Sequence, residues 1–188
     1  WNNAKRAVQN EGDLALFVYY IPVPKQGDSN AYSNAAFGLN LEAVTLDGNS
    51  GKINVSVMDG DLETGTWTPL SEENTDSLHN IKWIRVTATE AIAPGETSEI
   101  KVTYSVDKPE ELKKGQVIQF NARGTAVFPA GGGLSTLAMS TNAVFVDVAT
   151  ADYAVEYYYD GEKGTAPEGS STGGTVVVGN GANVELPE

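Results

Sequence analysis

Alternation of apolar and polar residues is the feature that most limits what this chain can fold into. In residues 98–106, SEIKVTYSV, apolar side chains occupy every second position and polar side chains the positions between them. Because successive side chains of a β-strand point to opposite faces, this segment makes a strand with one buried and one solvated face. The same pattern runs through residues 53–57, 117–128 and 144–148. The chain is therefore predicted to be all-β.

A doubly apolar run and a series of turns complete the predicted sandwich. Residues 14–21, LALFVYYI, are apolar at both parities, as in an inner strand whose two faces are covered. About seven to nine strands fit before residue 149, the number expected of an antiparallel immunoglobulin-like sandwich.

The helical candidate is the segment 107–115, DKPEELKKG, which is one or two turns long with Asp107 as its cap. We expect a hairpin at 46–51, turns at 58–65 and 93–96, and longer loops at 25–34 and 129–136.

A boundary is expected after Val148, so residues 1–148 form the sandwich and residues 149–188 a partial small β module or linker. In the segment DYAVEYYYDG, apolar and aromatic residues alternate with mostly polar ones until Asp160-Gly161. This segment is predicted to be a strand that enters a hairpin, because tyrosine combines packing area with a hydroxyl that can reach solvent. Two further predictions are a linker at 161–174 and a short strand at 175–179. So short a module has too few residues for an independent core.

The chain is strongly acidic, with 25 aspartates and glutamates against 12 lysines and arginines and a net charge of −13. Such a surface repels nucleic acid phosphates and anionic membranes, so neither is an expected partner. The absence of cysteine excludes disulfides, thiolate nucleophiles and zinc–thiolate sites. No signal peptide is visible and the sequence starts at Trp1, which predicts a processed chain or a piece of a larger one.

Catalytic residues are not predicted. A serine or acyl-transfer triad needs a general base, and the sole histidine, His79, has no nucleophile-elbow motif nearby. Paired carboxylates of a glycosidase could be drawn from the acids, but these fall mostly in turns and on polar strand faces. We therefore expect a non-enzymatic protein, with His79 in a loop before a strand at residues 81–89.

Two acidic turns have the oxygen-rich spacing of calcium loops. Asp47 and Asn49 belong to one, and Asp59, Asp61 and Glu63 to the other, with carboxylate or amide oxygens at alternate positions. Neither turn matches the full twelve-residue loop with its terminal glutamate, and Asp-Gly is also the commonest hairpin chemistry. We expect plain turns and no cofactor, with calcium at either turn as the alternative.

An intramolecular lysine–asparagine isopeptide bond would suit a surface domain without cysteine. The reaction needs both residues in an apolar pocket that lowers the lysine pKa, with a protonated acid between them. Lys52 or Lys101 with Asn142 are the candidates, although both lysines fall on the polar face of their strands.

Trp67 in TGTWTPL is the candidate ligand-binding residue, since an exposed aromatic ring in a turn-rich stretch can stack on a sugar. The competing interpretation is a side chain that closes the end of the sandwich. Trp83 alternates with Ile81 and is expected to pack in the core.

Three segments, residues 8–24, 100–128 and 140–148, resemble the immunoglobulin-like repeats of Gram-positive cell-surface proteins of the adhesin type. The shared motifs are an N-x-G entry to a strand, a following I-P, and an S-N-x-V-x-V ending, which here carries an insertion in STNAVFV. Residues 153–161, YAVEYYYDG, resemble the first strand of the mucin-binding-like β-grasp repeats that often follow. The resemblance implies a cell-wall or secreted location, repeat arrays and spacer or adhesive roles. The shortened C-terminal module departs from the family, so a mucin-binding role is not carried over.

The expected function is that of a stalk or spacer, a non-enzymatic structural or adhesive domain of an extracellular bacterial protein whose acidic coat keeps it soluble. One alternative is a subunit of an extracellular filament, in which a strand of one chain completes the sheet of the next. The other is a carbohydrate- or protein-binding module, whose partner is a glycan or a host or neighbouring surface protein. That module would present an aromatic or apolar patch near Trp67 or residues 25–34.

Overall fold

The computed structural model describes residues 16–48, 50–70, 78–91, 93, 95–130 and 132–177. Its contacts divide the chain into a first unit, residues 1–107 and 118–146, and a second unit, residues 108–117 and 147–188. Residues 108–117, which the sequence places in the sandwich, therefore group with the C-terminal part. In the described part of the chain, no helix is long and apolar enough to span a membrane.

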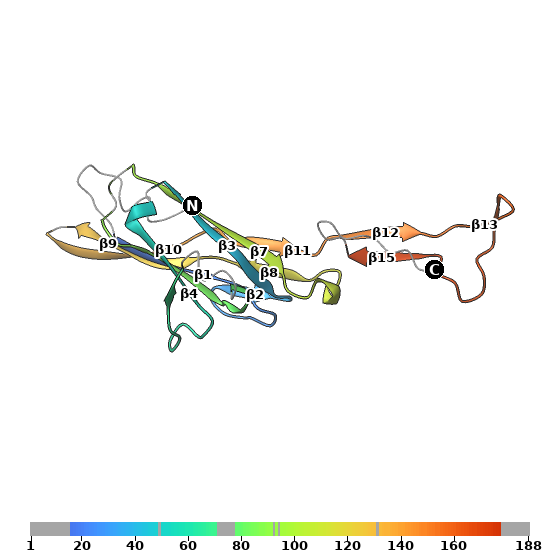
Figure 1. Cartoon of the computed structure of the whole chain (residues 1–188), viewed down its shortest axis with the longest axis horizontal. Coiled ribbons are helices and arrows are strands. Elements are labelled where there is room, and N and C mark those ends of the chain that lie inside the picture. Colours follow the sequence, from blue (N-terminus) through green and yellow to red (C-terminus); the bar gives the residue numbers. More distant parts are fainter. Residues whose placement is uncertain are drawn as a thin grey trace. The chain divides into compact units, whose positions relative to one another are not determined.

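A six-stranded antiparallel sheet forms the larger layer of the first unit (Figure 1). Its strands, in spatial order, are β10 (Gly133–Ser140), β9 (Arg123–Ala130), β1 (Leu16–Pro22), β6 (Trp83–Ala88), β4 (Ile53–Met58) and β5 (Thr68–Pro69). The strand β1 pairs with β9 on one side and with β6 on the other. The prediction of an inner strand in this region is therefore confirmed.

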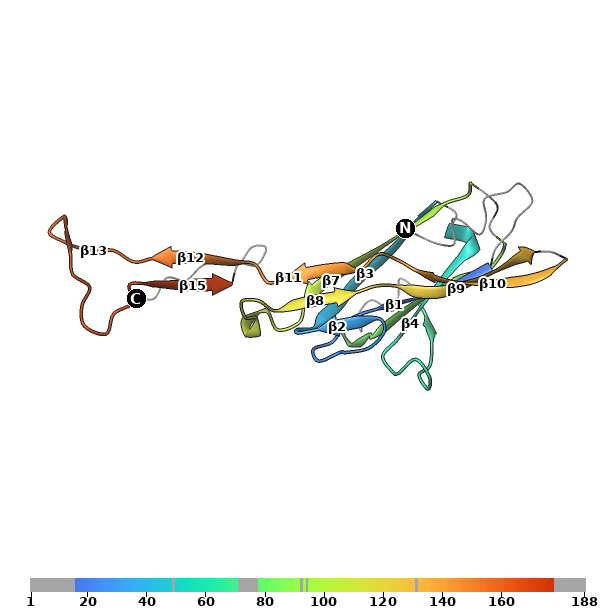
Figure 2. The same cartoon turned by 180° about the vertical axis from the view of Figure 1, so that it is seen from behind.

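Two smaller sheets are described beside the six-stranded sheet. The strands β3 (Leu39–Gly48) and β7 (Ser98–Val106) form an antiparallel pair and run side by side in Figures 1 and 2. The strands β11 (Val144–Asp147), β8 (Val117–Phe120) and β2 (Ser33–Ala35) form a three-stranded sheet in that order.

The core lies between the six-stranded sheet and the β3–β7 pair. Its fully buried members include Leu41 from β3 and Ile84 and Val86 from β6, and the alternating side chains of β7 pack against them. The hydroxyl of Tyr104 on β7 donates a hydrogen bond to the backbone oxygen of Pro22 on β1 at 3.1 Å. The prediction of an all-β, antiparallel, sandwich-like fold is confirmed.

Two predicted connections are wrong because pairing partners lie far apart in sequence. Residues 46–51 do not join a hairpin, since β3 pairs with β7 while β4 pairs with β5 and β6. The chain instead passes from one sheet to another through a 3-10 turn, η1 (Ser50–Lys52). Residues 129–136 are not a long loop, because β9 and β10 form a hairpin through this region. The predicted turn at 58–65 lies in the connection between β4 and β5, which pair with each other.

Local details also differ from the sequence pattern. Residues 117–128 do not form one strand, because the chain leaves β8 after Phe120 and enters another sheet at Arg123. The helical candidate is a single 3-10 turn, η3 (Pro109–Glu111), which has Lys108 instead of Asp107 at its N-cap position. Ser56, expected to face solvent, is only 8% exposed.

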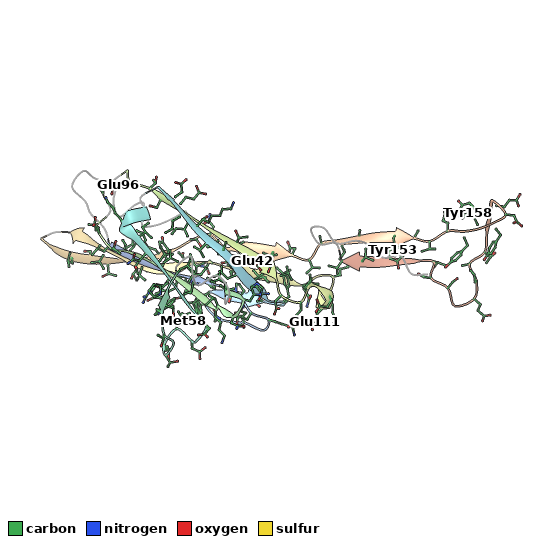
Figure 3. The ribbon with its side chains drawn as sticks, in the orientation of Figure 1. Glu42, Met58, Glu96, Glu111, Tyr153 and Tyr158 are labelled. Atoms are coloured by element: carbon green, nitrogen blue, oxygen red, sulfur yellow. The ribbon has the colours of Figure 1, made fainter. Side chains whose placement is uncertain are left out.

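The second unit consists of short antiparallel pairs. The strand β12 (Thr150–Ala154) pairs with β15 (Gly173–Val177), and β13 (Tyr157–Tyr159) pairs with β14 (Glu162–Gly164). Asp160 and Gly161 both have positive φ, 51° and 88°, as a two-residue hairpin turn requires, so the predicted Asp-Gly turn is confirmed. The predicted single strand is instead two, with Tyr153 on β12 and Tyr158 on β13 (Figure 3). The predicted linker contains β14.

Candidate functional site

Strand register sorts the side chains of the six-stranded sheet into a core face and an outer face. The core face carries Tyr19, Ile84, Val57 and Ala126, all buried. We define the outer face as the alternate positions on β1, β4, β5, β6, β9 and β10. Its described members are Leu16, Val18, Tyr20, Pro22, Asn54, Ser56, Met58, Pro69, Trp83, Arg85, Thr87, Arg123, Thr125, Val127, Leu134, Thr136, Ala138 and Ser140.

None of these described outer-face positions is an aspartate or glutamate, although the chain contains 25 acids. Both arginines that the structure describes, Arg85 and Arg123, lie on this face. They flank Tyr20 in one cross-strand row, because Tyr20 is the register partner of Arg85 on β6 and of Arg123 on β9. Adjacent strands are about 4.8 Å apart, so the two arginine backbones are roughly 10 Å apart.

Two further aromatic residues lie over this row from outside the strands. Trp67, just before β5, has its ring centroid 5.8 Å from that of Tyr20, and the guanidinium carbon of Arg85 lies 4.6 Å from the Trp67 centroid. Tyr32, just before β2, contacts Trp83 edge to face at 4.9 Å, with the guanidinium carbon of Arg123 at 5.9 Å. Cation–π contacts of this kind orient arginine side chains without neutralising their charge.

No described carboxylate neutralises the positive charge of this face. Among the described residues, neither arginine forms an ion pair with a carboxylate. Arg85 approaches the hydroxyl of Ser56 at 3.5 Å, and its Nε is buried without a hydrogen-bond partner. Burial raises the pKa of Tyr32, and the neighbouring Tyr20 adds to this shift while Arg123 opposes it. The face thus combines phenol hydroxyls with guanidinium groups that pair with no carboxylate of the described residues.

A shallow hollow of about 530 Å³ opens beside Arg123. Tyr20 and Tyr32 line it together with the short side chains of Thr125, Ala138 and Ser140. This volume falls within the usual range for small-molecule sites. The described lining offers hydroxyl groups, aromatic rings and one guanidinium fork, which can form hydrogen bonds and ring contacts with a ligand.

Trp67 was expected as an exposed ring, and the structure places it half-buried against Tyr20 and Arg85, so its role in ligand binding stays a prediction. The prediction for Trp83 is wrong, because it lies on the outer face against Tyr32 and not in the core cluster. Sequence reasoning missed Tyr20, Arg85 and Arg123. Only Arg123 occupies a polar-parity position in the sequence pattern, because Tyr20 lies in a run that is apolar at both parities and Arg85 shares the parity of Ile81 and Trp83. The strand register that aligns the three residues cannot be read from one sequence.

The two candidate calcium turns use their polar groups locally. Oδ1 of Asp47 accepts a hydrogen bond from the Gly48 amide at 2.7 Å, and Asn49 lies outside the described residues. The backbone oxygen of Asp61 accepts the Gly65 amide at 2.7 Å. Asp59 and Glu63 are exposed in the same turn. Over the described ranges, no three acidic, histidine or cysteine side chains gather as a metal site would require.

The candidate isopeptide residues lie in different surroundings. Nζ of Lys52 is 2.7 Å from a carboxylate oxygen of Glu96, near η1 (Figure 3), and both side chains are about 30% exposed. The hydrogen bond from Lys52 lowers the pKa of Glu96, whereas the reaction needs a protonated acid. Asn142 lines a groove with Ile100 and Val102, which point to the opposite face of β7 from the exposed Lys101. The isopeptide bond therefore stays a prediction, and the surroundings of Lys52 and Lys101 do not favour it.

That groove, of about 750 Å³, is mostly apolar and has side chains from β7, β8 and β11 along its walls. In the described sheets, β7 pairs only with β3, so its second edge adjoins the groove. Addition of a strand from another chain would need such an edge. The filament hypothesis therefore stays a prediction.

His79 lies before the strand β6, as predicted, but in a 3-10 turn and not in a plain loop. Its side chain is 67% exposed, and Nε2 lies 3.2 Å from a carboxylate oxygen of Glu42 on β3. Its backbone oxygen accepts a hydrogen bond from Nζ of Lys25 at 3.0 Å. These contacts join the turn to β3 and to Lys25.

Comparison with protein-family models, with curated proteins and with solved structures finds no match. The resemblance to immunoglobulin-like surface repeats therefore stays a prediction.

Proposed function

We propose that this chain is a non-enzymatic structural or adhesive domain, a stalk or spacer, of a bacterial cell-surface or secreted protein. The observation that carries the proposal is the distribution of its perturbed titratable groups. Lys25, Tyr32, Glu96, Tyr104 and Glu156 have shifted pKa values, and the largest cause of each shift is burial or a hydrogen bond. A catalytic centre would bring such groups together in one cleft.

Contacts between distant segments support a mechanical role. Nζ of Lys25 donates hydrogen bonds to the backbone oxygens of Leu39 and His79, at 2.8 and 3.0 Å, and burial lowers its pKa. Tyr104 joins β7 to β1 across the core through its hydroxyl. Such contacts hold loops and layers together, as a stiff and protease-resistant spacer requires.

The test of this role is an exchange in the surface protein that contains this chain. Replacing residues 1–188 by an unrelated β-sandwich of similar length should leave adhesion by the rest of that protein intact, at equal surface display. Loss of adhesion after the exchange would contradict a pure spacer role. Cell fractionation of the same strains tests the extracellular location, and the chain in the cytosol would contradict it.

The outer face favours a second function, a carbohydrate- or protein-binding module. Trp67 and Tyr32, from the two regions named by the sequence, lie over the same cross-strand row. A glycan array probed with the whole chain tests this function. Specific binding that is lost in Trp67→Ala supports it, and binding that Trp67→Ala leaves unchanged contradicts a role for this face.

A further inference from the structure

We propose that the outer face of the six-stranded sheet binds a carboxylate-bearing saccharide, such as a chain of hexuronic acids, with Arg123 holding a carboxylate in the hollow beside Tyr20 and Tyr32. This inference rests on the second function above, because it names the ligand class of a binding module. It does not depend on the spacer role.

The charge of the face selects an anion. The chain carries a net charge of −13, yet the described outer-face positions contain two arginines and no acid. In a chain with 25 acids, an arginine would find a carboxylate partner easily, and both described arginines lack one in the described part of the chain. The guanidinium fork matches the two oxygens of a carboxylate, so the missing partner is supplied by the ligand.

Arg123 is the arginine that can reach a ligand. Its side chain is exposed and lines the hollow of about 530 Å³, while the guanidinium of Arg85 lies against the Trp67 ring. Arg85 adds a fixed positive charge two strands away in the same row. Together they attract a ligand that carries carboxylates along its length.

The remaining lining favours a saccharide over an acidic peptide. Tyr20 and Tyr32 provide aromatic edges and hydroxyl groups, and Thr125 and Ser140 add hydroxyl groups in the same hollow. Sugar hydroxyls can both donate to and accept from such groups, and sugar rings pack against aromatic side chains. Below Tyr20 and Arg123 there is no free row of backbone amides for a peptide, because β1 and β9 are each paired on both sides.

The experiment is a calorimetric titration of the whole chain with oligogalacturonate. The methyl-esterified form of the same oligosaccharide is the matched ligand control, because it keeps the sugar backbone and removes the charge. Poly-glutamate tests the acidic peptide. Arg123→Gln is the test variant and Arg123→Lys keeps the charge without the fork. Lys101→Gln is the control variant, because it also removes one positive charge but at an exposed position on β7, outside this face.

We expect oligogalacturonate to bind at least about tenfold more tightly than its ester, since a hydrogen-bonded charge pair is worth that much or more. Arg123→Gln should weaken binding by about tenfold or more, Arg123→Lys by less, and Lys101→Gln hardly at all. Circular dichroism of each variant establishes that the exposed substitution leaves the fold intact.

Three results would overturn the proposal. Equal binding of the ester would leave a binding module but remove the acidic ligand class. Tighter binding of poly-glutamate than of oligogalacturonate would make the partner an acidic peptide. Absence of binding to every probe would remove the site, and the exchange experiment would still decide the spacer role.

Discussion

Ile84 and Arg85 are neighbours on β6, yet they belong to two different chemical surfaces. Ile84 is fully buried in the core, where it packs with Val86 and Leu41. Arg85 points the other way, against the ring of Trp67. The same alternation continues on β1, where Tyr19 is buried and Tyr20 lies between two arginines. One set of strands thus carries a surface that stabilises the fold and a second surface on which we propose that a ligand binds.

The difference teaches where function can be placed in a sandwich of this kind. Core positions are fixed by volume, because a packed interior does not tolerate loss or gain of a methylene group without cost. Exposed outer positions such as Arg123 are not fixed by packing, and they can change with little effect on folding. Substitutions at alternate positions of one strand should therefore separate stability from binding.

The largest effect on stability is expected for Ile84→Ala. This side chain has no exposed surface, so its truncation leaves a cavity and should lower the free energy of unfolding by about 2–5 kcal/mol. Arg85→Ala, one residue along β6, is the matched control and should cost less, about 1–2 kcal/mol, the size of a partly buried cation–π contact. Urea unfolding measures both. Equal costs for the two variants would remove the distinction between the faces.

Gly124→Ala is expected to have the next largest effect. A Cβ at this core-face position of β9 would lie 1.9 Å from the backbone oxygen of Val18 on β1, and neither strand can move freely. Overpacking of this kind costs about 1–3 kcal/mol. Gly133→Ala at the start of β10 is the control, since nothing lies within 4 Å of its Cβ position. A melting temperature for Gly124→Ala as high as that of Gly133→Ala would show that the β1–β9 contact is looser than described.

Tyr104→Phe should have a smaller effect that depends on pH. Burial raises the pKa of Tyr104 above its usual range, so the folded state holds this proton after the unfolded state has lost it. Stability is therefore unaffected below about pH 10 and falls as the pH rises above that value. The phenylalanine variant should lose about 1 kcal/mol at neutral pH, from the hydrogen bond to Pro22, and should show a flatter alkaline limb. A steep alkaline limb in the variant would assign the titration to another group.

The smallest effect is expected for Glu96→Gln, which lies outside both faces. The hydrogen bond from Lys52, with that from the Ala93 amide, lowers the pKa of Glu96. A lowered folded pKa gives stability that is present above the unfolded pKa, near 4.5, and is lost as the pH falls through the folded value. The wild type and the variant should therefore differ slightly at pH 7 and converge in acid. A difference that grows below pH 4 would contradict this linkage.

Alternation predicted the strands well, because it depends on a local property of extended backbone. Residues 98–106 form β7 with the expected alternation, and the Asp160-Gly161 turn forms where two positive φ values are needed. Which strands pair with each other was harder to predict from the sequence. The segment 46–51 has the composition of a hairpin turn. The strand β3 nevertheless pairs with β7, whose partners lie fifty or more residues away in sequence, and β4 pairs with β6.

The candidate site was predicted in part for the same reason. Trp67 could be named because a tryptophan in a turn-rich stretch is conspicuous in the sequence. Tyr20, Arg85 and Arg123 come from three strands, and only the register brings them into one row. The absence of acids from the described outer face could be recognised only after the faces were known.

The most direct test of the two-surface account is a nuclear magnetic resonance titration of the whole chain with oligogalacturonate. Side-chain Nε–Hε signals of Arg123 and Arg85 report on the outer face, and methyl signals of Ile84 and Val86 report on the core face of the same sheet. The account predicts that the arginine signals shift with ligand and the methyl signals do not. Shifts of the core methyl signals with unchanged arginine signals would contradict it.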